Sequence, residues 1–280
     1  MDFAVAVTKH LAGALKSTGL QVLILFGPGL ALAAAMQLVS SGVNRLGAGI
    51  LGMPFYYLTF PGTVIHELSH AAMCLLFRHR VTEMKLFAPD RHSGTLGYVN
   101  HRFDPSSPYQ VIGNFFIGLA PIIAGSLVIY FAATVLVTPS FFPAGGGTAG
   151  GAGDFSSMKA ASAPVLGAAE ASMEMLKGFL EPENLKDWRF YLFIYILLSV
   201  GGNLRLSVPD MRGAWSGFAL FCILLFVFNA IALFFGGMPV GLFHRLAGGY
   251  SFFYVVMGAA LLVNSALLVP LFLIRVVKKK

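Results

Sequence analysis

A His-Glu-Leu-Ser-His motif lies in an otherwise apolar stretch at residues 61–77. An α-helix turns by about 100° per residue, so His66 and His70, four residues apart, share one helix face and can bind one metal ion. Glu67 lies beside them. In such sites two neutral imidazoles hold Zn²⁺, and the adjacent carboxylate is the general base. The motif therefore predicts a zinc-dependent hydrolase.

The alternative for this motif is a polar patch at a helix end that binds no metal. Burial of three ionisable groups in a lipid-facing helix costs on the order of several kcal/mol unless the groups share a partner. A shared metal ion supplies such a partner, so we favour the metal site, with His66 and His70 as ligands and Glu67 as the catalytic residue.

The composition is typical of a membrane protein. Of the 280 residues, 57% are hydrophobic and 11% are charged, which lies outside the usual range of soluble domains. Six apolar stretches have about the length that crosses a bilayer. They are 20–43, 46–77, 110–137, 188–206, 214–237 and 250–277. We expect an all-α polytopic membrane protein, with residues 1–280 in a single membrane-embedded domain of about six transmembrane helices.

The net charge of +7 does not indicate a nucleic-acid partner. With the N-terminus inside and six crossings, most Lys and Arg residues fall on the cytoplasmic side, as the positive-inside rule requires. We therefore expect no nucleic acid, but a multi-pass protein of a cell membrane, such as a bacterial inner membrane. The basic end of the motif helix at Arg78 places the motif in the cytoplasmic half of the bilayer.

Proline and glycine divide the chain into its structural parts. Pro54 and Pro61 interrupt the second apolar stretch, so we expect a broken entry followed by a regular helix from Pro61. Residues 138–187 are rich in Gly and Ala and predict a flexible outside loop. Cys74 and Cys222 lie in apolar stretches without a Cys-x-x-Cys partner, and we interpret both as small core residues.

Two extended runs, 81–87 and 95–103, follow the motif helix and predict a β-hairpin with a long loop. An exposed strand edge beside a protease site could pair with an extended substrate. A solvated connector without a catalytic role is an equally weighted alternative. The hairpin supplies these candidate substrate-binding residues: Thr95, Leu96, Gly97, Tyr98, Val99 and Asn100.

The fourth apolar stretch ends in a second break. Gly201, Gly202 and Pro209 interrupt the helix and leave Asn203 and Asp210 at the break. Non-helical backbone at membrane depth is tolerated only against protein or a wet cavity, so the break itself indicates function. An ordinary turn capped by Asp210 is the alternative.

These features together resemble the site-2 protease family of intramembrane zinc metalloproteases. The resemblance rests on the His-Glu-Leu-Ser-His motif in a membrane helix, on the Gly- and Pro-bearing stretch that follows, and on four residues at the later break: Asn203, Pro209, Asp210 and Gly213. It implies that His66, His70 and Asp210 hold zinc and that Glu67 is the base. We also include Asn203 among the candidate substrate-binding residues.

Asp210 is also the best-placed third ligand by position, because the fourth stretch breaks at the membrane face that carries the motif. Glu83, His92 and His101 lie beyond the basic end of the motif helix, and we expect them not to bind the same zinc. The expected function is hydrolysis of a peptide bond in a membrane-associated polypeptide near the cytoplasmic leaflet. The alternatives are a membrane zinc hydrolase acting on a lipid or another amide, and a non-catalytic transporter or scaffold.

Overall fold

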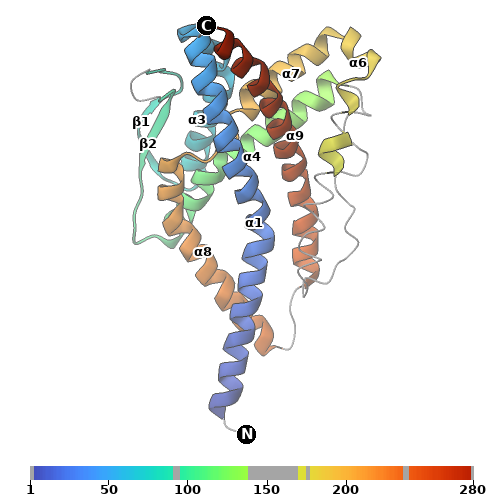
Figure 1. The fold of residues 1–280 in the computed structure, drawn as a ribbon. Coiled ribbons are helices and arrows are strands. Elements are labelled where there is room, and N and C mark those ends of the chain that lie inside the picture. The colour runs from blue at the N-terminus through green and yellow to red at the C-terminus, as the bar shows by residue number, and fades with distance from the viewer. Residues whose placement is uncertain (1–2, 91–94, 138–169, 175–176, 236–239, 279–280) are drawn as a thin grey trace.

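The computed structural model describes residues 3–90, 95–137, 170–174, 177–235 and 240–278. It is mostly helical and has a small two-stranded antiparallel sheet (Figure 1), which confirms the helical fold class with a hairpin. The elements are α1 (Phe3–Leu51), α2 (Met53–Leu58), α3 (Phe60–Leu76), β1 (Arg80–Lys85), β2 (Tyr98–Arg102), α4 (Pro108–Leu136), α6 (Pro182–Lys186), α7 (Trp188–Gly201), α8 (Val208–Phe234) and α9 (Val240–Lys278).

Four helical segments are long and apolar enough to cross a membrane. They are Ala4–Leu51, Pro108–Leu136, Val208–Phe234 and Phe253–Lys278. α3 has 17 residues and α7 has 14, so both are shorter than these four. Each of the six predicted stretches contains a helix. Of the described helices, however, only these four are both long enough and apolar enough to span a membrane, so the predicted number of about six spans is supported in part.

The entry to the motif helix is broken, as Pro54 and Pro61 predict. α1 ends at Leu51, and Gly52 adopts a φ of 70°, a left-handed conformation that glycine adopts readily. Pro54 and Pro61 then lie in the first turns of α2 and α3, where proline removes no helical hydrogen bond. The predicted stretch 46–77 is therefore three helices in sequence, and the motif lies in the last of them.

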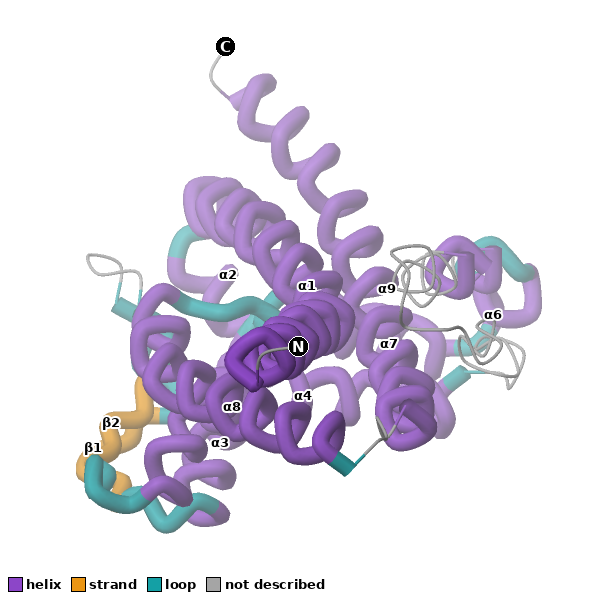
Figure 2. Tube along the Cα trace, turned by 90° about the horizontal axis from the view of Figure 1, so that it is seen from below, coloured by secondary structure: helices purple, strands orange, loops and turns teal. Residues whose placement is uncertain are grey.

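The core lies among helices that are far apart in sequence. α1 packs along α9, and α4 contacts α3, α7 and α8. Met36, Ile129, Phe193 and Val256, from α1, α4, α7 and α9, are all fully buried in one cluster. The hairpin lies at the side of this bundle (Figure 2). The end of α3 and the start of α8 are thus held against α4, beside the hairpin.

The hairpin forms close to the predicted runs. Its pairs include Arg80 with Arg102, Val81 with His101 and Lys85 with Tyr98, and the register shifts between Val81 and Glu83. The described sheet has only these two strands, so one edge of β2 pairs with no other described strand.

The predicted loop at 138–187 lies largely outside the described residues. Within its described part, α6 forms a short helix. The flexible-loop prediction for the rest of the segment stays a prediction.

Candidate metal centre

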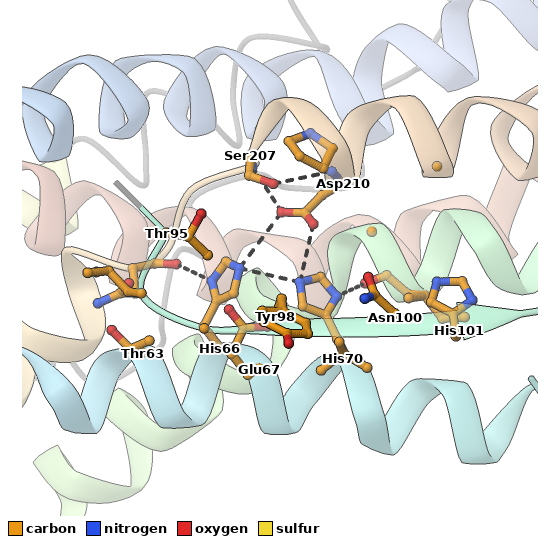
Figure 3. Close-up of a pocket in the computed structure, with 18 of the residues that line it drawn as sticks. Thr63, His66, Glu67, His70, Thr95, Tyr98, Asn100, His101, Ser207 and Asp210 are labelled. Atoms are coloured by element: carbon orange, nitrogen blue, oxygen red, sulfur yellow. Dashed lines mark hydrogen bonds and ion pairs between the residues drawn. The ribbon is translucent and has the colours of Figure 1, made fainter. Parts of the chain in front are cut away.

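The three ionisable residues of the motif, His66, Glu67 and His70, face the interior of the protein from α3. Glu67 and His70 are buried, with 8% and 6% of their surfaces exposed, whereas the intervening Leu68 is 51% exposed. His66 and His70 lie one turn apart and point toward α8 (Figure 3). The helix period thus separates the polar face of α3 from its apolar outer face.

Backbone carbonyls fix the orientation of both imidazole rings. Nδ1 of His66 lies 3.0 Å from the carbonyl oxygen of Asn203, and Nδ1 of His70 lies 2.8 Å from that of Ile117. A carbonyl oxygen can only accept, so both Nδ1 atoms are donors and the neutral rings keep their lone pairs on Nε2. The two Nε2 atoms face each other at 3.3 Å. Metal-binding histidines are commonly oriented in this way, with the ring N–H that does not face the metal donating to a carbonyl or carboxylate oxygen.

Asp210 brings a carboxylate to the same point from α8. Its Oδ2 lies 3.7 Å from Nε2 of His66, and its Oδ1 lies 3.4 Å from Nε2 of His70. Asp210 also completes a capping box with Ser207: its main-chain N–H donates to the Ser207 hydroxyl at 3.2 Å, and its Oδ2 accepts from the Ser207 N–H at 3.0 Å. This double contact holds the carboxylate at the helix start.

The break before α8 differs from the predicted one in one respect. Pro209 lies in the first turn of α8 and does not interrupt it. The non-helical backbone lies instead in the short turn after Gly201. Asp210 is therefore a helical residue that takes part in the cap of α8 and also faces the motif histidines, and the functional interpretation of the break stays a prediction.

Close contact between α4 and α8 places Asp210 beside the motif. A Cβ atom at Gly118 would lie 3.0 Å from the main-chain oxygen of Asp210 and 2.6 Å from the Cβ of Ala214. Only glycine therefore lets the two helices approach this closely. α4 contacts α3 as well, so it acts as the common support for His70 and Asp210, which are 140 residues apart in the chain.

The three side chains fit a zinc ion. With Zn–N and Zn–O bonds of about 2.0–2.2 Å, two ligand atoms of a tetrahedral site lie roughly 3.3–3.6 Å apart. The separations of 3.3, 3.4 and 3.7 Å match this within a small adjustment. His66, His70 and Asp210 also form a metal-ligand group by donor type, with all ligand atoms within 4.8 Å. Three protein ligands leave the fourth position open, as in catalytic sites.

Glu67 lies at a cavity of about 560 Å³ that the ligands also line. A Cβ atom at Gly97 would lie 2.7 Å from Cγ of Glu67 and 2.8 Å from the carbonyl oxygen of Lys85. Glycine therefore leaves the space that the Glu67 side chain occupies between α3 and the hairpin.

All the predicted substrate-binding residues line this cavity, namely Thr95, Leu96, Gly97, Tyr98, Val99, Asn100 and Asn203. The carbonyl of Asn203 accepts from His66, and its side-chain amide donates to the carbonyl of Ser199 at 2.9 Å. Asn203 thus orients the His66 ring through its carbonyl, whereas its contact with substrate stays a prediction.

Of the three loop residues expected not to bind the same zinc, the structure describes Glu83 and His101. Glu83, on β1, accepts a hydrogen bond from the Tyr98 hydroxyl. His92 lies outside the described residues. His101 lines the cavity, but its Nδ1 lies 3.0 Å from Nδ1 of His79. Burial, with the neighbouring His79, lowers the pKa of His101 and favours the neutral ring.

Four polar residues of the cavity were missed by sequence reasoning: Thr63, Asn114, Arg205 and Ser207. Thr63 precedes Glu67 by about one helical turn, so the helix period alone could have predicted that the two residues share a face of α3. The hydroxyl oxygen of Thr63 is buried and has no hydrogen-bond partner among the described residues. Arg205 lies in the turn before Asp210, whereas nothing in the sequence connects Asn114 with the motif.

Comparisons with protein-family models, with curated proteins and with solved structures found no match. The function of this chain is therefore inferred from the geometry of its own residues.

Proposed function

We propose that the protein is a zinc-dependent membrane metallopeptidase that hydrolyses a peptide bond in a membrane-associated polypeptide near the cytoplasmic leaflet. One observation carries this proposal. The Nε2 atoms of His66 and His70 and the carboxylate of Asp210 converge at zinc-like separations, with the opposite nitrogen of each ring engaged by a backbone carbonyl.

His66, His70 and Asp210 would hold the zinc ion. When bound, zinc supplies a Lewis acid that polarises a carbonyl and makes water more acidic. Glu67 is the general base: its carboxylate takes a proton from the attacking water and then passes it to the leaving amine. Because Gly97 has no side chain, the Glu67 side chain has the space that it occupies beside the cavity. Each group thus has one role, either ligation or proton transfer.

The hairpin supports a polypeptide substrate. β2 borders the cavity along Tyr98, Val99 and Asn100, and one of its edges pairs with no described strand. An extended peptide could add to this edge by main-chain hydrogen bonds, which would present its scissile bond to Glu67. We therefore favour a peptide bond over a lipid ester or another amide as the substrate.

The proposed setting is the lipid bilayer of a cell membrane, such as a bacterial inner membrane. Four apolar helices of sufficient length support a membrane location. The substrate would reach the site as a membrane protein or peptide. A lipid or amide hydrolase is the second candidate, since the same ligands and base would serve it.

Purified wild-type protein, reconstituted in liposomes, tests the proposal with two substrates in parallel. One is a membrane-spanning peptide carrying labels at both ends, and the other is the liposome lipid itself. We expect zinc in the protein and two peptide fragments in mass spectra. Cleavage of lipid alone would establish the second candidate, and bound zinc without any hydrolysis would support a transporter or scaffold.

A further inference from the structure

We propose that Cys74, His79 and His101 form a second metal site, for Zn²⁺ or a similar thiophilic divalent ion, that clamps the hairpin to the end of α3. This site is separate from the proposed catalytic centre. The inference rests on a buried cysteine of α3, on a histidine just after the end of α3, and on a histidine of β2.

The three donor groups converge. The Sγ of Cys74 and one ring nitrogen each of His79 and His101 all lie within 4.8 Å of one another. Cys74 and His79 are buried, with 0% and 4% of their surfaces exposed. In a tetrahedral zinc site two nitrogens lie about 3.3 Å apart, and a sulfur and a nitrogen about 3.6 Å apart. Small side-chain adjustments would therefore complete the site.

The ring of His79 is oriented as a metal ligand is. Its Nε2 lies 2.8 Å from the carbonyl oxygen of Gln110, so Nε2 carries the proton and Nδ1 presents its lone pair. That lone pair faces Nδ1 of His101 at 3.0 Å. Without a metal, His101 must donate a proton across this gap. With a metal, both Nδ1 lone pairs and the sulfur have one common partner.

The backbone between Cys74 and His79 supplies an independent observation. The N–H of His79 donates to the carbonyl of Cys74 at 2.8 Å, and the N–H of Arg78 donates to that of Leu75 at 3.2 Å, which is a Schellman turn. Its left-handed position is usually glycine, yet Arg78 occupies it with a φ of 58°. Unfavourable backbone of this kind concentrates at functional sites. Here it brings His79 back over Cys74.

The position of the site indicates a structural role. Cys74 ends the face of α3 that carries His70, and four residues of helix rise about 6 Å. Cocatalytic metal pairs lie closer, at about 3.5–4 Å, so we infer two separate metals. His101 and the preceding Asn100 both line the cavity. A metal at this point would fix β2 relative to the motif helix and so hold the proposed substrate edge in place.

The donor set indicates zinc. One thiolate and two imidazoles suit a borderline-soft ion such as Zn²⁺ or Co²⁺, and do not suit Mg²⁺ or Ca²⁺. On binding, the Cys74 thiol releases its proton to solvent and the sulfur forms the metal bond. His79 and His101 bind as neutral rings. The Nδ1 proton with which His101 bonds to His79 moves through solvent to His101 Nε2, so the two imidazoles release no net proton.

Metal counting on the full-length protein tests the second site. We expect about two zinc equivalents per wild-type chain, and about one in each of three variants: His66→Ala/His70→Ala, Cys74→Ala and His101→Ala. Cys222→Ala and His10→Ala are the matched controls and should keep both. Combining His66→Ala/His70→Ala with Cys74→Ala should remove all zinc. Thermal unfolding of each variant confirms that the chain is folded.

Cobalt substitution identifies the ligand directly. After zinc is removed by a chelator and replaced by Co²⁺, a thiolate-to-cobalt charge-transfer band should appear in wild type, in Cys222→Ala and in His66→Ala/His70→Ala. It should vanish in Cys74→Ala. A wild type with one zinc that His66→Ala/His70→Ala removes, or a band that survives in Cys74→Ala, would overturn the second site and leave the proposed function standing. A wild type with one zinc that Cys74→Ala removes and His66→Ala/His70→Ala keeps would overturn the proposed zinc centre and leave the second site standing.

Discussion

Two candidate metal-binding groups are built on α3, and they differ in how the chain assembles them. The proposed catalytic group joins His66 and His70 to Asp210, which is distant in sequence, whereas the proposed second group takes Cys74, His79 and His101 from a local segment. The first lines the cavity together with Glu67, whereas the second borders it through His101 and holds a buried thiol. An accessible site with a neighbouring base suits hydrolysis, and a more buried thiol-containing site suits a structural clamp.

α4 unites the two groups. Its Ile117 carbonyl orients His70, and its Gln110 carbonyl orients His79. These carbonyls are seven residues, or about two turns, apart and so lie on one face of α4. The same helix therefore fixes a ring in each group, and the difference between the groups comes from the third ligand and from access to the cavity.

The largest effect is expected from Glu67→Gln. Loss of the proposed base should lower peptide hydrolysis by roughly 10²–10⁴-fold, because proton transfer contributes that much. Both metals should remain, since Glu67 ligates neither. Cleavage assays combined with metal analysis check this. Loss of zinc with activity would make Glu67 a ligand, and full activity would remove the proposed mechanism.

Asp210→Ala should separate the two groups by their metals. We expect the affinity of the catalytic site for zinc to fall by more than the roughly 10–100-fold that is typical when a hydrogen-bond partner of a ligand is lost. Activity should fall with it, and the metal of the second site should stay bound. Ser207→Ala is the matched control, because it removes the cap at a cost of about 0.5–2 kcal/mol but keeps the carboxylate. Equal zinc loss in both variants would assign Asp210 to capping alone.

Gly97→Ala tests how the hairpin and Glu67 share space. The added methyl would meet Cγ of Glu67 and the Lys85 carbonyl, and overpacking of this kind costs about 1–3 kcal/mol. We expect a reduced turnover number with both metals bound. Metal titration and cleavage rates measured on the same preparation check this. Unchanged turnover would show that the position of Glu67 does not depend on the hairpin.

The smallest effect is expected from proline substitutions at residues 95–100. Each removes one backbone donor, worth about 0.5–1.5 kcal/mol, and only alternate residues face a substrate added at the edge of β2. Peptide cleavage should therefore fall several-fold at alternate positions, with metal content unchanged. Thr82→Pro on β1, outside the cavity, is the control. Uniform tolerance would return the hairpin to the role of a connector.

Much of the site was accessible from local sequence patterns. The spacing of His66 and His70 in an apolar helix depends only on the helix period, and the broken entry depends on Pro54 and Pro61. The two runs of the hairpin followed from their extended pattern and its turn residues. These features involve neighbours in the chain, so residue types and spacing suffice to predict them.

The tertiary structure decided what lies together across the chain. It placed the Asp210 carboxylate against two Nε2 atoms, a position that required Gly118 to admit α8 close to α4. It also brought His79 and His101 to Cys74, a convergence that no spacing rule predicts because a turn and a strand pairing produce it. Sequence by itself determined which helix carries the motif and which residue types could bind a metal. Only packing determined their partners, because distances between distant residues depend on how whole helices fit against one another.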